Sequence, residues 1–342
     1  MKKAKKLRTK YTIALLYHYL SKEEQKQYFS REHVITDTQM QTDEIVSYMR
    51  ALFRRRGYRA QTIKVEEKNL SNLKKLTDVD FVFNLVDSKA LEIQIARILD
   101  RLKIPHSGSS LEAIRTTNNK LHSKQLFEKH SLPTPSYTTI RRTDRITRNL
   151  VPGKFPVIIK PAFEHCSIGI TDHSIVQNYA QFKRTVKRLR DKHRQTLLVE
   201  AFIPGKELQV TVLETPDKTL ALPIAEIVFP RKESKWNIYG FKEKWTKHFD
   251  TCLFVAPPKR LADTITTQIK REAIRAFYAL GLRDYARFDL RFNPKIRRWY
   301  FLEANANAGF DPDPRDAMTA SIRAHGMTLD DFVLQIVKNS LN

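Results

Sequence analysis

The stretch YARFDLRFNPKIRRWYFLEANAN (285–307) contains two segments in which apolar and polar residues alternate, separated by an Asn-Pro turn. Alternation with a period of two is typical of β-strands, and two such strands joined by a short turn predict an antiparallel hairpin. Because successive side chains of a strand point to opposite faces, one face of this hairpin is expected to be apolar. The residues expected on that face are Phe288, Leu290, Phe292, Tyr300, Leu302 and Ala304.

Four polar side chains are expected on the other face of the hairpin. With the turn centred near residue 296, Arg287 lies opposite Asn305 and Asp289 lies opposite Glu303. Two carboxylates and an amide oxygen suit a hard divalent cation such as magnesium, which keeps few protein ligands so that phosphate oxygens can complete its coordination. Arg287 adds a second positive charge for the phosphate that the magnesium ion would bind, so we expect a phosphoryl-transfer site. The alternative is a surface hairpin whose polar face is only solvated.

The composition is that of a globular protein with more than one domain. The chain has 342 residues, of which 41% are hydrophobic, and no apolar run approaches the roughly 20 residues of a bilayer span. The early stretch TIALLYHYL follows a basic segment, but it is short and lacks a cleavage site, so it predicts a buried first strand rather than a secretory signal. Two cysteines, Cys166 and Cys252, cannot form a disulfide framework. We therefore expect a cytoplasmic protein without a membrane segment.

The net charge is strongly positive. The chain contains 61 lysine and arginine residues against 37 aspartate and glutamate residues, which gives a formal net charge of +24. In the most basic segment, KRTVKRLRDKHR (183–194), apolar residues recur at helical spacing, so the basic residues predict the solvent-facing side of an amphipathic helix. No RRM, KH, zinc-finger or zipper signature accompanies the charge, which argues against a nucleic-acid partner. Association with nucleic acid through basic helices stays an alternative.

The pattern of strands and helices changes along the chain. The first third alternates the strand patterns TIALLYHYL, TIKV and DFVFNLV with helical patterns, which predicts an α/β domain with a parallel sheet. From about residue 118, strands such as FPVIIKP and TLLVEAFI follow in an α+β arrangement. We therefore expect three domains, which cover residues 1–117, 118–205 and 206–342.

Two more segments place polar side chains at the ends of apolar strands. Lys160 stands at the end of the predicted strand FPVIIKP. Ser167 and the backbone amides of the loop after this strand are candidates to bind a phosphate. TLLVEAFIPGKEL carries Glu200 among apolar neighbours, where a buried carboxylate needs a donor. The exocyclic amine of adenine would serve, and Glu207 beyond the turn would accept from ribose hydroxyls. The alternative for either carboxylate is a structural salt bridge.

In their order and spacing these segments resemble the ATP-grasp superfamily, most closely its D-alanine:D-alanine ligase-like branch. The motifs are NNK (118–120), IIKP, SIGI, LLVEAFIPGKEL, a lysine near 244, YARFDLR and FLEANAN, and the resemblance runs from about residue 79 to the end. It implies an ATP-grasp fold, in which an N-terminal parallel-sheet domain precedes two lobes that clasp ATP. It also implies an ADP-forming ligase, in which a carboxylate attacks ATP to give an acyl phosphate and an amine then displaces phosphate to form an amide.

The resemblance also implies a role for each matching residue. The ATP phosphates would be held by the lysines Lys120, Lys160 and Lys244, with Lys242 as a competitor for the last position, and by the loop around Ser167. Adenine would be read by Glu200 and the backbone from Ala201 to Ile203, and ribose by Glu207. Two magnesium ions, or manganese in their place, would be bound by Asp289, Glu303 and Asn305. Arg287 would stabilise the transferring phosphoryl group.

Three departures from the family pattern concern the substrates. The phosphate loop has His165, Cys166 and Ser167 where the family has Gly-Ser-Ser, a tyrosine becomes Trp245, and Pro314 stands near the position of a serine that binds the product carboxylate. We therefore expect amino acid or peptide substrates other than two D-alanines, and the positive net charge favours acidic ones. A MgATP-binding module without catalysis is the alternative.

The pair His165 and Cys166 permits one more hypothesis, an activated thiol nucleophile. Ligation through an acyl phosphate needs no thiol, and neighbouring residues of a loop tend to point apart, so the hypothesis is disfavoured. The sequence leaves a homodimer open.

Overall fold

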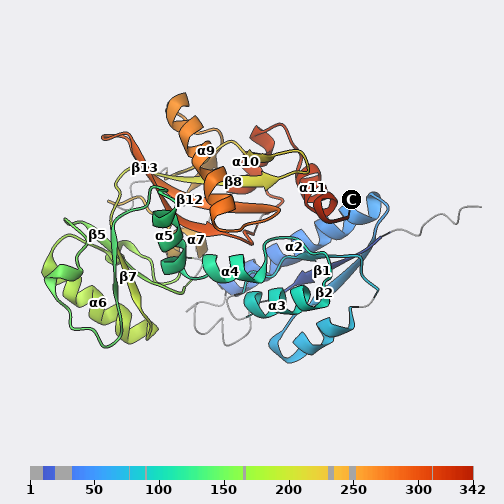
Figure 1. The fold of residues 1–342 in the computed structure, drawn as a ribbon, viewed down its shortest axis with the longest axis horizontal. Helices are drawn as coiled ribbons and strands as arrows, with labels where there is room; N and C mark the ends of the chain where they lie inside the picture. The colour runs from blue at the N-terminus through green and yellow to red at the C-terminus, as the bar shows by residue number, and fades with distance from the viewer. Residues whose placement is uncertain are drawn as a thin grey trace, which may run out of the picture. The chain divides into compact units, whose positions relative to one another are not determined.

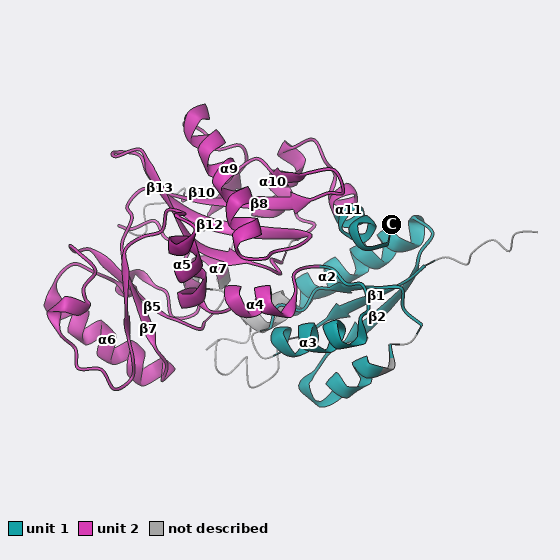
Figure 2. Cartoon of the chain, in the orientation of Figure 1, with its two compact units in different colours: residues 1–107, 333–342 teal, residues 108–332 magenta. Residues whose placement is uncertain are grey.

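The structure, a computed structural model, divides into two compact units: residues 1–107 with 333–342, and residues 108–332 (Figure 2). The residues that it describes are 11–19, 33–76, 78–88, 91–164, 167–229, 235–245, 252–309 and 311–341. We call the two parts unit 1 and unit 2. The three domains expected from the sequence, with boundaries at 117 and 205, stay a prediction. No helix of the described residues has the length and hydropathy to cross a membrane.

Unit 1 contains a parallel sheet, as predicted. Its strands run in the order β2-β1-β3, with bounds β1 (Thr12–Tyr17), β2 (Arg59–Lys64) and β3 (Phe81–Asn84). The helices of this unit are α2 (His33–Arg55), the 3₁₀ helix η1 (Glu67–Lys75) and α3 (Glu92–Leu102). Ile13 and Leu16 of the central strand are completely buried, which confirms the predicted first strand.

Unit 2 contains a four-stranded antiparallel sheet, which we call the small sheet. Its order is β4-β7-β5-β6, with bounds β4 (Tyr137–Ile140), β5 (Val157–Pro161), β6 (Ile175–Val176) and β7 (Leu197–Ala201). The helix α6 (Tyr179–His193) packs on this sheet (Figure 1). Phe182, Val186 and Leu189 face the sheet, whereas Lys183 and Lys187 are exposed. The predicted solvent-facing role of the basic segment is therefore confirmed.

Unit 2 also contains a larger antiparallel sheet in the order β11-β10-β8-β12-β13, with β9 paired to β8. The strand bounds are β8 (Lys206–Glu214), β9 (Thr219–Ala221), β10 (Ala225–Val228), β11 (Leu253–Val255), β12 (Tyr285–Asn293) and β13 (Arg298–Asn305). The helices of this part of the chain are α4 (Leu111–Thr117), α5 (Lys120–Lys129), α7 (Phe241–Trp245), α9 (Asp263–Ala279), α10 (Ala317–Ala324) and α11 (Leu329–Leu341). The last helix begins in unit 2 and ends in unit 1.

The predicted hairpin is formed by β12 and β13. Arg287 pairs with Asn305 and Asp289 pairs with Glu303, so the four polar residues lie on one face as the alternation indicated. The hairpin lies at one side of the larger sheet, where β13 is the edge strand and β12 also pairs with β8 along its length.

Beyond these two pairs the register shifts by one residue, a β-bulge that leaves Leu302 unpaired. Leu290 therefore pairs with Phe301, and the prediction that Tyr300 and Leu302 lie on the apolar face was wrong. Phe301 and Trp299 take their places, with ring centroids 5.2 Å apart. The physical reason is burial, since both aromatic side chains are almost fully removed from solvent in this register.

The link between β7 and β8 passes very close to the hairpin at Gly205. Its φ is +125°, and an ideal Cβ there would lie 2.2 Å from the carbonyl oxygen of Phe292. Only glycine therefore fits this position without movement of the backbone.

We expect Gly205→Ala to lower the free energy of unfolding by about 3 kcal/mol or more, because steric overlap adds to the backbone strain. Gly153→Ala is the matched control, since Gly153 has φ +81° and open space around it, and it should cost about 1 kcal/mol. Urea unfolding of both variants gives the comparison. Equal losses would contradict the assigned close approach.

Candidate active site

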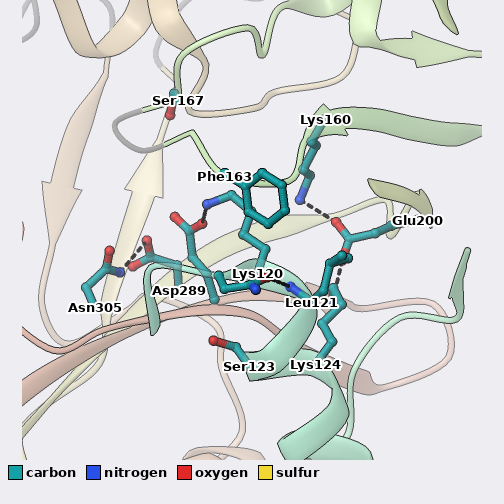
Figure 3. Close-up of polar contacts among 12 residues, drawn as sticks. Lys120, Leu121, Ser123, Lys124, Lys160, Phe163, Ser167, Glu200, Asp289 and Asn305 are labelled. Carbon is teal, nitrogen blue, oxygen red and sulfur yellow. Dashed lines mark hydrogen bonds and ion pairs between the residues drawn. The ribbon is translucent and has the colours of Figure 1, made fainter. Parts of the chain in front are cut away.

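The polar face of the β12–β13 hairpin forms the first part of the site. Arg287 Nε donates to Asp289 Oδ1 at 2.8 Å, and its Nη2 donates to Oδ2 at 3.2 Å. Asn305 Nδ2 donates to the same Oδ2 at 3.2 Å, so the amide oxygen of Asn305 is left for another partner (Figure 3). Asp289 is only 8% exposed. The predicted metal ligands and the predicted arginine are thus neighbours.

Helix α5 brings a lysine to this face. Lys120 is the first residue of the helix, and the Asn119 side chain caps the helix by accepting from the Leu121 N–H. Lys120 Nζ donates to Glu303 Oε2 at 2.5 Å. The predicted phosphate lysine therefore lies against a predicted metal ligand.

The two carboxylates have opposite pKa shifts. Burial raises the pKa of Asp289, and although the Arg287 guanidinium opposes this, the Glu303 carboxylate adds to it. Burial acts in the same direction on Glu303, but the Lys120 ammonium outweighs it and holds the pKa of Glu303 well below its usual range. A divalent cation between the two carboxylates would favour the charged form of both.

The donor set fits magnesium. Two carboxylates and one amide oxygen on a rigid strand pair are hard oxygen ligands, and they leave coordination positions for phosphate oxygens. The described residues contain no cluster of three or more His, Cys, Asp or Glu side chains around one metal position.

The second part of the site lies on the small sheet, where Glu200 is completely buried. Glu200 of β7 pairs with Ile158 of β5, which puts its side chain on the same face as Lys160. Both Lys160 and Lys124 of α5 form ion pairs with its carboxylate (Figure 3). The salt bridge that the sequence left as an alternative is therefore present, and adenine recognition by Glu200 stays a prediction.

The three charges of this cluster shift one another's pKa. Burial lowers the pKa of Lys124, and the nearby Lys160 ammonium contributes to the fall. Burial also opposes the charge of Lys160 and of Glu200, but their attraction raises the pKa of Lys160 and lowers that of Glu200. The Lys160–Glu200 pair is therefore ionised at neutral pH.

Glu207 also has a cationic partner that sequence reasoning missed. Arg291 Nη1 donates to Glu207 Oε2 at 3.0 Å, and the Tyr239 N–H donates to the same oxygen at 3.1 Å. Arg291 is 3% exposed and also donates to the carbonyl oxygens of Ile203 and Gly205, at 2.9 and 3.1 Å. It thereby fastens β12 to the segment expected to read adenine. Ribose binding by Glu207 stays a prediction.

The remaining predicted residues lie in loops and at element ends. Ser167 has φ +60°, and its Oγ donates to the Tyr239 carbonyl oxygen at 2.9 Å. The positive charge of Lys244 on α7 acts to lower the pKa of Asp289, which places Lys244 near the hairpin face. The Ala201 N–H donates to the Ser136 carbonyl oxygen at 2.9 Å. The structure does not describe the side chains of four residues named in the sequence analysis: His165, Cys166, Lys242 and Trp245. The thiol hypothesis for His165 and Cys166 therefore stays a hypothesis.

A further acid near this face was missed at the start of α10. Asp316 caps the helix by accepting from the N–H groups of Met318 and Thr319, at 2.9 and 3.1 Å. Burial raises its pKa from 3.8 to about 6, although these N–H groups and the Arg287 guanidinium favour the charged form.

The sequence contained a signal for two of the residues that the sequence analysis missed, Arg291 and Lys124. Arg291 follows Asp289 by two residues on a strand, so the period of two put it on the polar face. Lys124 follows Lys120 by four residues on a helix, so both lie on one side of it. No pattern in the chain marked Asp316 as a neighbour of Arg287.

Comparison with known proteins agrees with this geometry. Residues 126–338 match the family model described as D-ala D-ala ligase C-terminus. A D-alanine–D-alanine ligase of Carboxydothermus hydrogenoformans is 27% identical, over 84% of this chain and 90% of that protein. A D-alanine–D-alanine ligase of Polaromonas naphthalenivorans is 31% identical, over 71% of this chain and 72% of that protein. The crystal structure of a Bacillus anthracis D-alanine–D-alanine ligase complexed with ATP is similar with a TM-score of 0.73 at 20% identity, over 97% of each chain, which confirms the ATP-grasp fold.

Asp316 gives a prediction for the pH dependence of stability. Its folded-state pKa lies above the ordinary value, so its contribution to the free energy of unfolding is fully present below pH 3.8 and is lost as the pH rises through about 6. Asp316→Asn keeps a capping oxygen and cannot ionise. We expect it to unfold with a free energy about 2 to 3 kcal/mol higher than the unsubstituted protein at pH 7, and less than about 1 kcal/mol higher at pH 4.

Urea titrations at the two pH values measure this difference. Asp191→Asn, at an exposed position of α6, is the control and should show the same small effect at both pH values. A pH-independent effect of Asp316→Asn would contradict the assignment.

Proposed function

The chain belongs to the D-alanine–D-alanine ligase family, and we propose that it joins a carboxylate to an amine through an acyl phosphate, with conversion of ATP to ADP. As a member of this family it is an ATP-dependent ligase. One observation carries the proposed reaction. Arg287, Asp289, Glu303 and Asn305 occupy one face of a hairpin, and Lys120 lies in contact with that face.

We propose that Asp289, Glu303 and Asn305 hold two magnesium ions. The amide of Asn305 supports this, because its nitrogen is hydrogen-bonded to Asp289 and its oxygen is left to face a cation. Bound magnesium supplies neutralisation of phosphate charge and fixes the orientation of the phosphates. Manganese, which takes similar oxygen ligands, would substitute.

The cationic side chains then act on the phosphates. Arg287 stabilises the negative charge that develops on the transferring phosphoryl group, and its bidentate contact with Asp289 fixes its orientation. Lys120, Lys160 and Lys244 neutralise the phosphate oxygens. Ser167 and the backbone of its loop cover the phosphates, and the protein contributes mainly positioning and charge.

We propose that the adenine lies along the linker from Ala201 to Ile203, beside Glu200, and that the ribose lies near Glu207. The contacts of Arg291 support this, because they hold the Ile203 carbonyl and the Glu207 carboxylate in fixed positions. Adenine's exocyclic amine would donate to Glu200, which the neighbouring lysines keep ionised.

Amino acids or peptides are the proposed substrates, and we propose a pair other than two D-alanines. Support comes from the segment 311–316, which carries Pro314 near the position where the resemblance places a carboxylate-binding serine. The proposal that the substrate is acidic is supported by the formal net charge of +24 alone. The comparisons lend no support to the catalytically silent module or to the nucleic-acid-associated protein. A homodimer stays a prediction.

Arg287→Met tests the reaction. We expect release of phosphate from MgATP with the best carboxylate and amine pair to fall about 100- to 1000-fold, because the charge on the transferring group loses its stabilising partner. The dissociation constant for MgATP should change by less than about threefold. A coupled phosphate assay and calorimetry measure the two quantities.

The substrate pair comes from a screen of amino acids and dipeptides, D-alanine included, scored by product mass together with ADP formation. Arg184→Met, on the exposed side of α6, is the control and should retain full activity. ATP binding without turnover on any pair, or an active Arg287→Met protein, would contradict the proposed function.

A further inference from the structure

The buried carboxylate of Glu200 has two cations, one more than it needs for charge balance. Lys124 reaches it from α5 and Lys160 reaches it from β5. The exposed fractions are 0% for Lys124 and Glu200 and 7% for Lys160, so the cluster is almost completely removed from solvent. A buried excess charge is costly, and its presence here calls for a reason.

The two lysines are held in different ways. Lys124 Nζ donates to Thr134 Oγ1 at 2.7 Å and lies 5.6 Å from the ring centroid of Tyr137, in addition to its ion pair. Thr134 Oγ1 in turn donates to the Phe301 carbonyl oxygen at 3.0 Å, which anchors it to the larger sheet. Lys124 is therefore fixed by three partners from separate segments.

Lys160 has a single anchor. Among the described residues, Glu200 is its one hydrogen-bonding or ion-pair partner. Its charge also interacts with Glu303 and Glu207, so it lies toward the side of the site where the nucleotide is proposed to bind. One contact holds its ammonium group, and rotation about its side-chain bonds would move that group to a nearby phosphate.

We propose that Lys124 is a positioning residue, a permanent counter-ion of Glu200 that allows Lys160 to leave this carboxylate for the nucleotide phosphates. This inference rests on the proposed function. Without Lys124, the movement of Lys160 would leave a buried carboxylate with no cation, which is strongly unfavourable. With Lys124 in place, Glu200 stays paired, ionised and correctly oriented while Lys160 binds phosphate.

The electrostatics of the cluster support this exchange. Burial is the largest cause that lowers the pKa of Lys124, and the Lys160 ammonium lowers it further. The Glu200 carboxylate acts in the opposite direction. When Lys160 moves to a phosphate, this repulsion falls and the pKa of Lys124 rises. Lys124 therefore becomes a stronger counter-ion at the moment when Glu200 depends on it alone.

Lys124→Met is the first test, since methionine fills a similar volume without a charge. Lys160 should then stay on Glu200, and we expect the dissociation constant for MgATP to rise about 10- to 100-fold, with a matching rise in KM and a change in kcat below about threefold. Lys129→Met, at an exposed position of the same helix, is the control and should bind MgATP normally. Calorimetry with MgATP and the phosphate assay provide the measurements.

The second test separates the proposed exchange from a packing role. In the Glu200→Gln background, Lys160 has no carboxylate to hold it, so adding Lys124→Met should change the MgATP affinity by less than about threefold relative to Glu200→Gln alone. Lys124→Arg, which keeps the charge, should bind MgATP normally. Loss of packing at Lys124 would instead lower the affinity in both backgrounds.

Each result decides the inference. Unchanged MgATP affinity in Lys124→Met, or an equally large loss when Lys124→Met is made in the Glu200→Gln background, overturns it. A Lys124→Met protein that does not fold also overturns it, because the Lys160–Glu200 pair should by itself compensate the buried carboxylate. If the unsubstituted protein does not bind MgATP, the proposed function fails, which is a distinct outcome.

Discussion

A carboxylate in a protein interior keeps its charge only beside a cation, and this requirement organises the site of unit 2. Four of its acids lie in ion pairs: Glu200 with Lys124 and Lys160, Glu207 with Arg291, Asp289 with Arg287, and Glu303 with Lys120. All of these pairs except the one within β12 join different secondary-structure elements. The charges that the proposed chemistry uses therefore also hold the site together.

Helix α5 connects the two sheets through these pairs. Lys120 contacts Glu303 of the larger sheet, and Lys124, one helical turn later, contacts Glu200 of the small sheet. A displacement of α5 from either sheet would break one of the two contacts. In the proposed reaction, Asp289 and Glu303 would hold magnesium, Lys120 and Lys160 bind the phosphates, and Lys124 stays with Glu200. Partners are then exchanged, and no group is left charged and alone.

Local features of this chain were determined by the sequence alone, because the period of the apolar residues is a property of neighbouring positions. The alternation around 285–307 paired Arg287 with Asn305 and Asp289 with Glu303, as the structure has them. The helical spacing within 183–194 predicted the exposed basic side of α6. The buried first strand and the parallel sheet of unit 1 followed from the same kind of pattern.

Tertiary structure alone decided the bulge at Leu302 and the partners of the site acids. The alternating pattern continues through Leu302, but stacking of Phe301 on Phe127, with ring centroids 5.2 Å apart, buries more aromatic surface and shifts the register. Lys124 and Glu200 are far apart in the sequence, so no local periodicity relates them. Their contact exists because α5 packs against β13 and directs Lys124 toward Glu200 of β7, where the cost of a buried unpaired charge favours the ion pair.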